Sequence, residues 1–147
     1  MTGTNHVLTG IAIAVTIKNP IAAPFVAFLS HFALDMVPHF GHPSIDPGSK
    51  HFVFRNLVLF LVIDACFCFT ALFWALLSWP SLWLTIILST GFATLPDFMW
   101  IAHYGYKVNS WFFDFAKRIQ VYEKPPGLVI EVIFVILVIT LLISHTI

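Results

Sequence analysis

Charged residues are scarce in this sequence: Asp, Glu, Lys and Arg together make up 10% of its 147 residues. Soluble domains carry about a quarter of such residues, so the chain lacks the polar surface that a water-soluble fold needs. Hydrophobic residues account for 59% of the sequence, and this excess predicts an integral membrane protein. Because the apolar segments are too short to form separate domains, we predict a single transmembrane domain over residues 1–147.

Other shortages exclude further classes of protein. Seven basic residues balance seven acidic ones, so the net positive charge that nucleic-acid binding requires is lacking. The two cysteines, Cys66 and Cys68, point to different faces of a helix, which excludes a disulfide framework and a CxxC metal pair. The N-terminal stretch MTGTNHVLTG lacks the basic residues of a signal peptide.

Apolar runs separated by proline-containing and polar breaks predict an all-α polytopic membrane helix bundle of four to five spans plus one interfacial helix. The predicted spans are residues 4–17, 21–37, 56–77, 82–104 with an interruption at Pro96, and 128–147. The first is shorter than the about 20 residues that a span needs, so the first two segments either cross fully or form a re-entrant hairpin. Residues 107–124 carry apolar side chains at helical spacing between polar ones, among them Val108, Trp111 and Tyr122, which predicts an amphipathic helix in the membrane interface.

The basic residues predict the orientation. If the segments cross in alternation, Lys18 falls alone on one side of the membrane. The other side receives six basic residues: Lys50, Arg55, Lys107, Lys117, Arg118 and Lys124. The positive-inside rule makes that side cytoplasmic and places the N-terminus in the cytoplasm.

Most ionisable residues of the apolar segments share one level. At about 1.5 Å of rise per helical residue, they fall in the cytoplasmic half of the membrane, with His145 as the exception. A carboxylate in mid-membrane costs about 2.5–3.5 kcal/mol, so several at one depth are expected to pair, hold a cation or line a wet cavity. The residues are His6, His31, Asp35, His39, Asp64, Asp97, His103 and Glu131.

The stretch SHFALDMVPHF places His31, Asp35 and His39 four residues apart, so that His31 and Asp35 share one face of a helix, which His39 joins if it does not turn away. Imidazoles combined with carboxylates suit zinc first, then manganese or iron. We therefore predict a divalent metal held by His6, His31, Asp35 and Asp97. His39 follows a proline, and it either joins these ligands or turns into the loop.

A zinc site with an open position acidifies bound water, which predicts hydrolysis of an ester or phosphoester. Asp64 would be a ligand, orient an imidazole or act as general base, and His39 and His103 would protonate a leaving group. Glu131 would form a salt bridge or serve as a base. A site just below the interface would meet a lipid sideways, so the expected partners are the bilayer and a lipid headgroup substrate.

Two other functions stay open at this point. Intramembrane Asp and His residues also mark ion, proton or metal transport pathways, although the nearly bare outer half of the membrane argues against a route to both faces. Polar groups can also bind helices together in a non-enzymatic scaffold. Whether the chain forms a homo-oligomer is not determined by its sequence.

The motifs NHVLTG, SHFALDMVPHF and TLPDF, within residues 5–98, resemble those of the predicted membrane-bound metal-dependent hydrolases, a bacterial family of small multi-span proteins. Their order is faintly similar to that of the helical zinc-dependent phospholipase C group. The resemblance implies His6, His31, Asp35 and Asp97 as metal ligands, with His39 matching less closely, in a multi-pass protein of the bacterial inner membrane. The commoner form of the family carries PDxDH, whereas this chain has Met and Trp in the last two positions of that motif.

Overall fold

The structure is a computed structural model that describes residues 1–47, 49–106, 111–120 and 123–146, without the side chains of 100–102 and 104–106. Over these ranges the chain is all-α, as predicted, and forms six α-helices and one 3-10 turn. They are α1 (Gly3–Ile17), α2 (Ala22–Asp35), α3 (Phe54–Ser78), η1 (Pro80–Leu82), α4 (Trp83–Tyr106), α5 (Trp111–Ile119) and α6 (Gly127–Ser144).

Three helical stretches in the described part of the chain are long and apolar enough to cross a membrane: Phe54–Ser78, Pro80–Met99 and Gly127–Ser144. Helices α1 and α2 are apolar but have only 15 and 14 residues. At about 1.5 Å per residue they are shorter than a hydrocarbon core of about 30 Å. The expectation of four to five spans is therefore not confirmed; the structure offers three such stretches and two shorter apolar helices.

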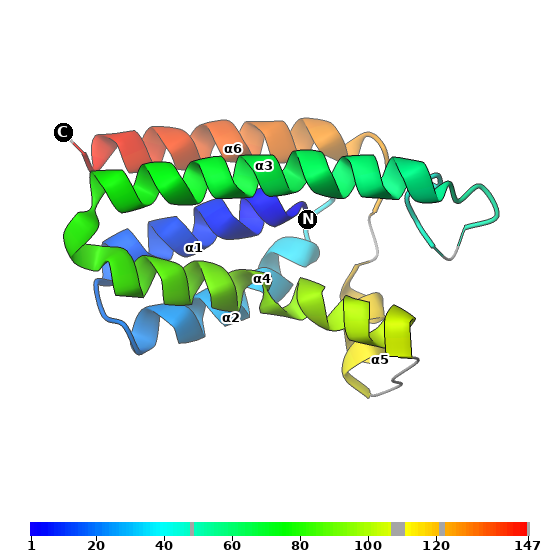
Figure 1. The fold of residues 1–147 in the computed structure, drawn as a ribbon, viewed down its shortest axis with the longest axis horizontal. Coiled ribbons are helices and arrows are strands. Elements are labelled where there is room, and N and C mark those ends of the chain that lie inside the picture. The colour runs from blue at the N-terminus through cyan, green and yellow to red at the C-terminus, as the bar shows by residue number, and fades with distance from the viewer. Residues whose placement is uncertain (48, 107–110, 121–122, 147) are drawn as a thin grey trace.

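Helices α1 and α2 form a hairpin against the longer helices (Figure 1). The turn of this hairpin lies at the same end of the bundle as the α3–α4 connection and the C-terminus, whereas α1 begins and α2 ends near the middle of the long helices. Lys18 ends α1 in the left-handed conformation (φ 55°). The side-chain oxygen of Asn19 then accepts hydrogen bonds from the backbone amides of Ile21 and Ala22 at 2.9 and 3.0 Å, which caps the start of α2.

Helix α1 is the central helix and packs against α2, α3, α4 and α6. The core around it consists of apolar side chains, among them Leu8, Ile11, Ile86 and Leu142. The outward faces of α3 and α6 expose large apolar residues, which suits contact with lipid acyl chains rather than water. Buried polar side chains, among them Asn5, His6 and Glu131, lie inside the bundle.

The close approach of α1 and α4 is possible because small residues line their contact. A Cβ on Gly10 would lie 3.0 Å from the Ser89 carbonyl oxygen and from Thr90 Cα. Ser89 and Ala93 are fully buried. Small residues let membrane helices approach closely, and this crossing brings the first turn of α1 beside the second half of α4.

Two local predictions need correction. Helix α4 continues through Pro96, so the predicted interruption there is wrong, although Pro96 cannot donate a hydrogen bond to the preceding turn. The amphipathic helix is shorter than predicted: α5 covers Trp111–Ile119 and buries Phe113 and Ala116. Residues 107–110 and 121–122, which include Lys107, Val108 and Tyr122 of the predictions, lie outside the described residues.

Candidate metal centre

The structure brings together His6, His31, Asp35 and Asp97, the four residues that the sequence predicts as ligands. One ligand atom of each lies within 4.8 Å of the others. Three helices supply them: α1, α2 and α4. The side chains of His6, His31 and Asp35 are at most 2% exposed, and that of Asp97 is 37% exposed, so the group is closed on one side and open on the side of Asp97.

Asp35 is the centre of this group. Its Oδ1 atom lies 3.2 Å from His6 Nε2, and its Oδ2 atom lies 3.2 Å from His31 Nε2. The Asp97 oxygens are farther away, at 3.9 Å from His6 Nε2 and 3.8 Å from His31 Nε2. Ligand atoms about 2.0–2.1 Å from a tetrahedral zinc ion are about 3.3–3.4 Å apart. Each Asp35 distance fits this spacing, but the two distances start from different oxygens of the carboxylate, and Asp97 would have to approach by roughly half an ångström.

The two imidazoles present lone pairs that suit a cation. His31 Nδ1 lies 2.8 Å from the Ala93 carbonyl oxygen, and because a carbonyl only accepts, this nitrogen donates its hydrogen. The Nε2 lone pair of neutral His31 then faces the carboxylate of Asp35, an arrangement typical of metal-binding histidines. His6 is fully buried, and among the described residues its Nδ1 atom has no hydrogen-bond partner, while its Nε2 atom makes the 3.2 Å approach to Asp35. The donor set therefore fits a divalent metal such as zinc.

Two further groups contact Asp35. The side-chain amide of Gln120, just after α5, donates a hydrogen bond to Asp35 Oδ2 at 2.8 Å, and the amino group of Met1 pairs with Oδ1. Gln120 is not among the site residues predicted from the sequence. It lies 85 residues from Asp35, and a lone glutamine at the end of an amphipathic helix carries no motif that would have identified it.

The residues predicted to act as catalytic acid or base lie outside the group of four. Asp64 accepts hydrogen bonds from the start of α1. His39 Nδ1 donates to the Val37 carbonyl oxygen at 2.8 Å. The His103 ring packs on that of Phe113, with 4.4 Å between centroids. The structure therefore brings four of the five predicted ligands together and leaves His39 out of the group. The predicted acid–base residues Asp64, His39 and His103 lie outside it.

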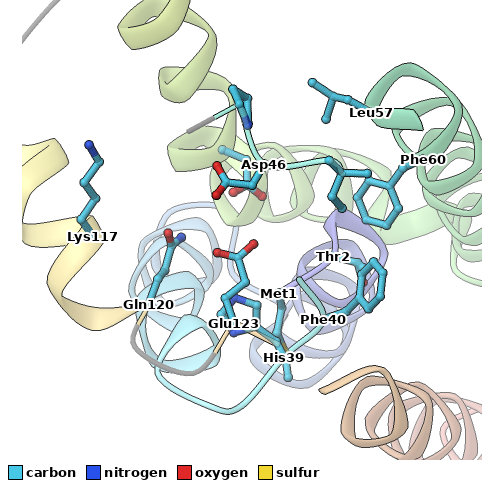
Figure 2. Close-up of a pocket in the computed structure, with 13 residues that line it drawn as sticks. Met1, Thr2, His39, Phe40, Asp46, Leu57, Phe60, Lys117, Gln120 and Glu123 are labelled. Atoms are coloured by element: carbon cyan, nitrogen blue, oxygen red, sulfur yellow. The ribbon is translucent and has the colours of Figure 1, made fainter. Parts of the chain in front are cut away.

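A pocket of about 370 Å³ lies beside the metal group and shares Asp97 with it. Figure 2 shows Phe40 and Phe60 on one side of this pocket and Lys117 and Gln120 on the other. Small-molecule pockets measure about 300–1,000 Å³. The pocket can thus hold a small polar group at Asp97 while an apolar portion of the same molecule contacts the aromatic rings.

Carboxylates also line the pocket between these two walls, from Asp46 and Glu123. Burial raises the pKa of the Glu123 carboxyl, while the charge of neighbouring His39 opposes the shift. Residues 39–41 and 123–124 are joined by backbone hydrogen bonds, from the Lys124 amide to the His39 carbonyl (3.0 Å) and from the Gly41 amide to the Lys124 carbonyl (3.3 Å). These bonds attach the loop after α2 to the segment before α6, and His39 and Glu123 of these two segments line the pocket.

Chemically, the site combines a buried pair of imidazoles, two carboxylates and an adjoining amphipathic pocket. This combination can hold a metal ion on one side and a polar ligand on the other. Comparisons with models of protein families, with curated proteins and with solved structures find no match to this chain.

Proposed function

We propose that this protein is a membrane-embedded, metal-dependent hydrolase of the bacterial inner membrane that acts on an ester or phosphoester at the cytoplasmic interface. The observation that carries the proposal is the group of His6, His31, Asp35 and Asp97, whose ligand atoms lie within 4.8 Å of one another. A buried donor set of this kind is costly in a membrane unless it is paired or holds a cation. Zinc is the metal that it suits best, with manganese or iron as the alternatives.

The depth of the group supports a reaction near one membrane surface. Asp97 follows Trp83, the first residue of α4, by 14 positions, which corresponds to about 21 Å along the helix. In a hydrocarbon core of about 30 Å, this places Asp97 in the half of the membrane opposite the α3–α4 connection. Under the proposed orientation, with the N-terminus cytoplasmic, this is the cytoplasmic half.

Each residue of the group has a proposed role. His6, His31, Asp35 and Asp97 hold the metal, and Gln120 orients Asp35 through its 2.8 Å hydrogen bond. A bound zinc ion would supply a Lewis acid and lower the pKa of a coordinated water molecule. His39 lines the pocket and is therefore the better placed of the predicted proton donors to a leaving group.

The pocket supports a lipid headgroup as the substrate. Lys117 and Gln120 of its polar wall, together with a metal held at Asp97, would receive the ester or phosphoester, while Phe40, Leu57 and Phe60 would contact the apolar portion. A lipid can reach such a site sideways from the bilayer, with its polar end at the interface.

Metal analysis of the purified protein tests this proposal most directly. The wild type, purified without chelators, is compared with His31→Ala and Asp35→Asn, and with the control His145→Ala, which removes an exposed histidine after α6. We expect about one bound metal ion in the wild type and the control, and a large loss in the other two variants. Sub-stoichiometric metal in the wild type, or unchanged metal in both site variants, would refute the metal centre.

Turnover is then measured in vesicles made from bacterial lipid extract, with and without a chelator. We expect release of a water-soluble headgroup that depends on the metal and is lost in Asp35→Asn. Metal flux into the vesicles without lipid turnover would instead support transport. Bound metal with neither activity would leave only a structural role for the site.

A further inference from the structure

Two carboxylates inside the bundle, Asp64 of α3 and Glu131 of α6, belong neither to the metal group nor to any ion pair between side chains that the structure describes. We propose that both are positioning residues: they cap the N-terminus of α1 and thereby hold His6 in the metal group. The inference rests on the proposed function in one respect, because it takes His6 to be a metal ligand.

Asp64 binds the first turn of α1. Its Oδ2 atom accepts a hydrogen bond from the Gly3 amide at 2.8 Å, and its Oδ1 atom accepts one from the Thr4 amide at 3.0 Å. The Thr4 hydroxyl also donates to Oδ1 at 2.5 Å. A Cβ on residue 3 would lie 2.8 Å from Oδ2, so the close approach of this carboxylate requires glycine there.

Glu131 binds the residues on either side of this turn. Its Oε2 atom accepts hydrogen bonds from the Thr2 hydroxyl at 2.6 Å, the Thr2 amide at 3.3 Å and the Asn5 side-chain amide at 2.9 Å. Its Oε1 atom accepts from the amide of Phe40 at 2.9 Å. The side chain is only 3% exposed, and it ties α1 and the loop after α2 to α6.

The caps are needed because α1 begins near the middle of the long helices (Figure 1). The first backbone N–H groups of a helix have no partner within it, and in a membrane each unsatisfied group costs several kcal/mol. Thr2 precedes the helix but makes no side-chain cap; its hydroxyl instead donates to Glu131 and accepts from the side-chain amide of Asn5. Asp64 and Glu131 supply the missing acceptors, and their negative charge also suits the positive end of the helix dipole.

With these caps every amide from residue 2 to residue 6 has an acceptor. Thr2, Gly3 and Thr4 donate to the two carboxylates, and the amides of Asn5 and His6 donate to the Thr2 carbonyl at 3.1 and 3.4 Å. All four oxygens of Asp64 and Glu131 accept at least one hydrogen bond from the protein, so both carboxylates are held at the start of α1 and the loop after α2.

The position of His6 depends on this turn. His6 lies two residues after Thr4, and a shift of α1 by one residue changes its height by about 1.5 Å and its direction by about 100°. Such a shift would break the 3.2 Å approach of His6 Nε2 to Asp35. Asp64 and Glu131 therefore act on the metal group through α1, without touching the metal.

The test compares Asp64→Asn and Glu131→Gln with two controls, Thr70→Val on α3 and Thr140→Val on α6. In the described part of the chain, both control hydroxyls bond within their own helix, to the carbonyls of Cys66 and Ile136. In metal-free protein, NMR of the Gly3 and Thr4 amides and of the His6 ring measures the cap. We expect faster amide exchange and changed shifts at these groups in Asp64→Asn, shifts at Thr2 and His6 in Glu131→Gln, and no change in the controls.

Cobalt(II) titration then measures the positioning of His6. We expect about 10–100-fold weaker binding in both variants, as is usual when a residue that supports a metal ligand is removed, together with an altered absorption spectrum of the bound cobalt. Asp64→Glu, which keeps the charge, is expected to recover part of the affinity. If Asp64→Asn does not fold, Thr4→Val removes one hydrogen bond of the same cap and is measured in its place.

Two results would overturn the inference: unchanged amide and His6 signals in the variants, or changed signals with cobalt affinity and spectrum equal to wild type. If the wild type binds no metal, the proposed function fails instead. The cap is then judged by the amide and His6 ring signals alone, which need no metal.

Discussion

Gly10 is the position where a single methyl group should do most damage to the contact between α1 and α4. In Gly10→Ala the new Cβ would lie 3.0 Å from the Ser89 carbonyl oxygen and Thr90 Cα, and 3.1 Å from the Ser89 carbonyl carbon. Non-bonded carbon atoms prefer about 3.5–4.0 Å. All three neighbours are backbone atoms, so no side-chain rotation relieves the clash and the helices must separate by roughly half an ångström.

The expected cost follows from two opposing effects. Overpacking a well-packed core costs about 1–3 kcal/mol, whereas replacing glycine by alanine within a helix gains about 1 kcal/mol. We expect a net loss of up to about 2 kcal/mol in the free energy of unfolding. The separation would also move His6 away from Asp97, whose side chains are already 3.9 Å apart, so metal affinity should fall as well.

The assay is an SDS titration of the reconstituted protein, followed by zinc titration of the same samples. Gly91→Ala is the matched control, because Gly91 lies on α4 near Ser89, and a methyl group there would meet no atom within 4 Å in the described part of the chain. We expect that control to be neutral or more stable by about 0.5–1 kcal/mol. Equal stability and equal zinc affinity of Gly10→Ala and wild type would refute the argument that this contact sets the spacing of α1 and α4.

Three further predictions concern the metal group and the loop after α2. Gly127→Ala places a Cβ against the His39 carbonyl. In the same SDS titration we expect a loss of about 2–3 kcal/mol in the free energy of unfolding. A stability within error of wild type would contradict the packing of the loop after α2 on α6. Gln120→Leu removes the hydrogen bond to Asp35 and should weaken zinc binding about 10-fold or more by competition with a chelating dye; a zinc affinity equal to that of wild type would contradict the positioning role of Gln120. Zinc at 100 times its dissociation constant should stabilise the wild type by about 2.7 kcal/mol but not Asp35→Asn, and equal stabilisation of both would show that zinc binds elsewhere.

Several parts of the fold could be predicted from local patterns. The long apolar runs that become α3 and α6 are visible because a lipid-facing helix must be apolar over its whole length. Asp35 lies four residues after His31, and any helix through this stretch places both on one face. The structure confirms the all-α fold and brings His6 and Asp97 to this pair.

Other predictions are wrong or incomplete because they depend on contacts between distant segments. The sequence predicts an interruption at Pro96, yet α4 continues, since packing of its neighbours can compensate for one lost hydrogen bond. The depth of Asp64 matches that of the histidines and therefore predicts a ligand, an imidazole acceptor or a base. Depth, however, does not distinguish a carboxylate that faces the metal group from one that faces the end of a helix.

The sequence by itself determined that this chain is helical, largely apolar, and carries a histidine–aspartate pair on one helical face, because composition and helical periodicity are local properties. The tertiary structure alone decided that α1 begins deep inside the bundle and which acceptors its amides find. It also decided that Gln120 reaches Asp35 and that a pocket opens beside Asp97. These features arise from the packing of helices that are far apart in the chain, and no spacing within a single segment encodes them.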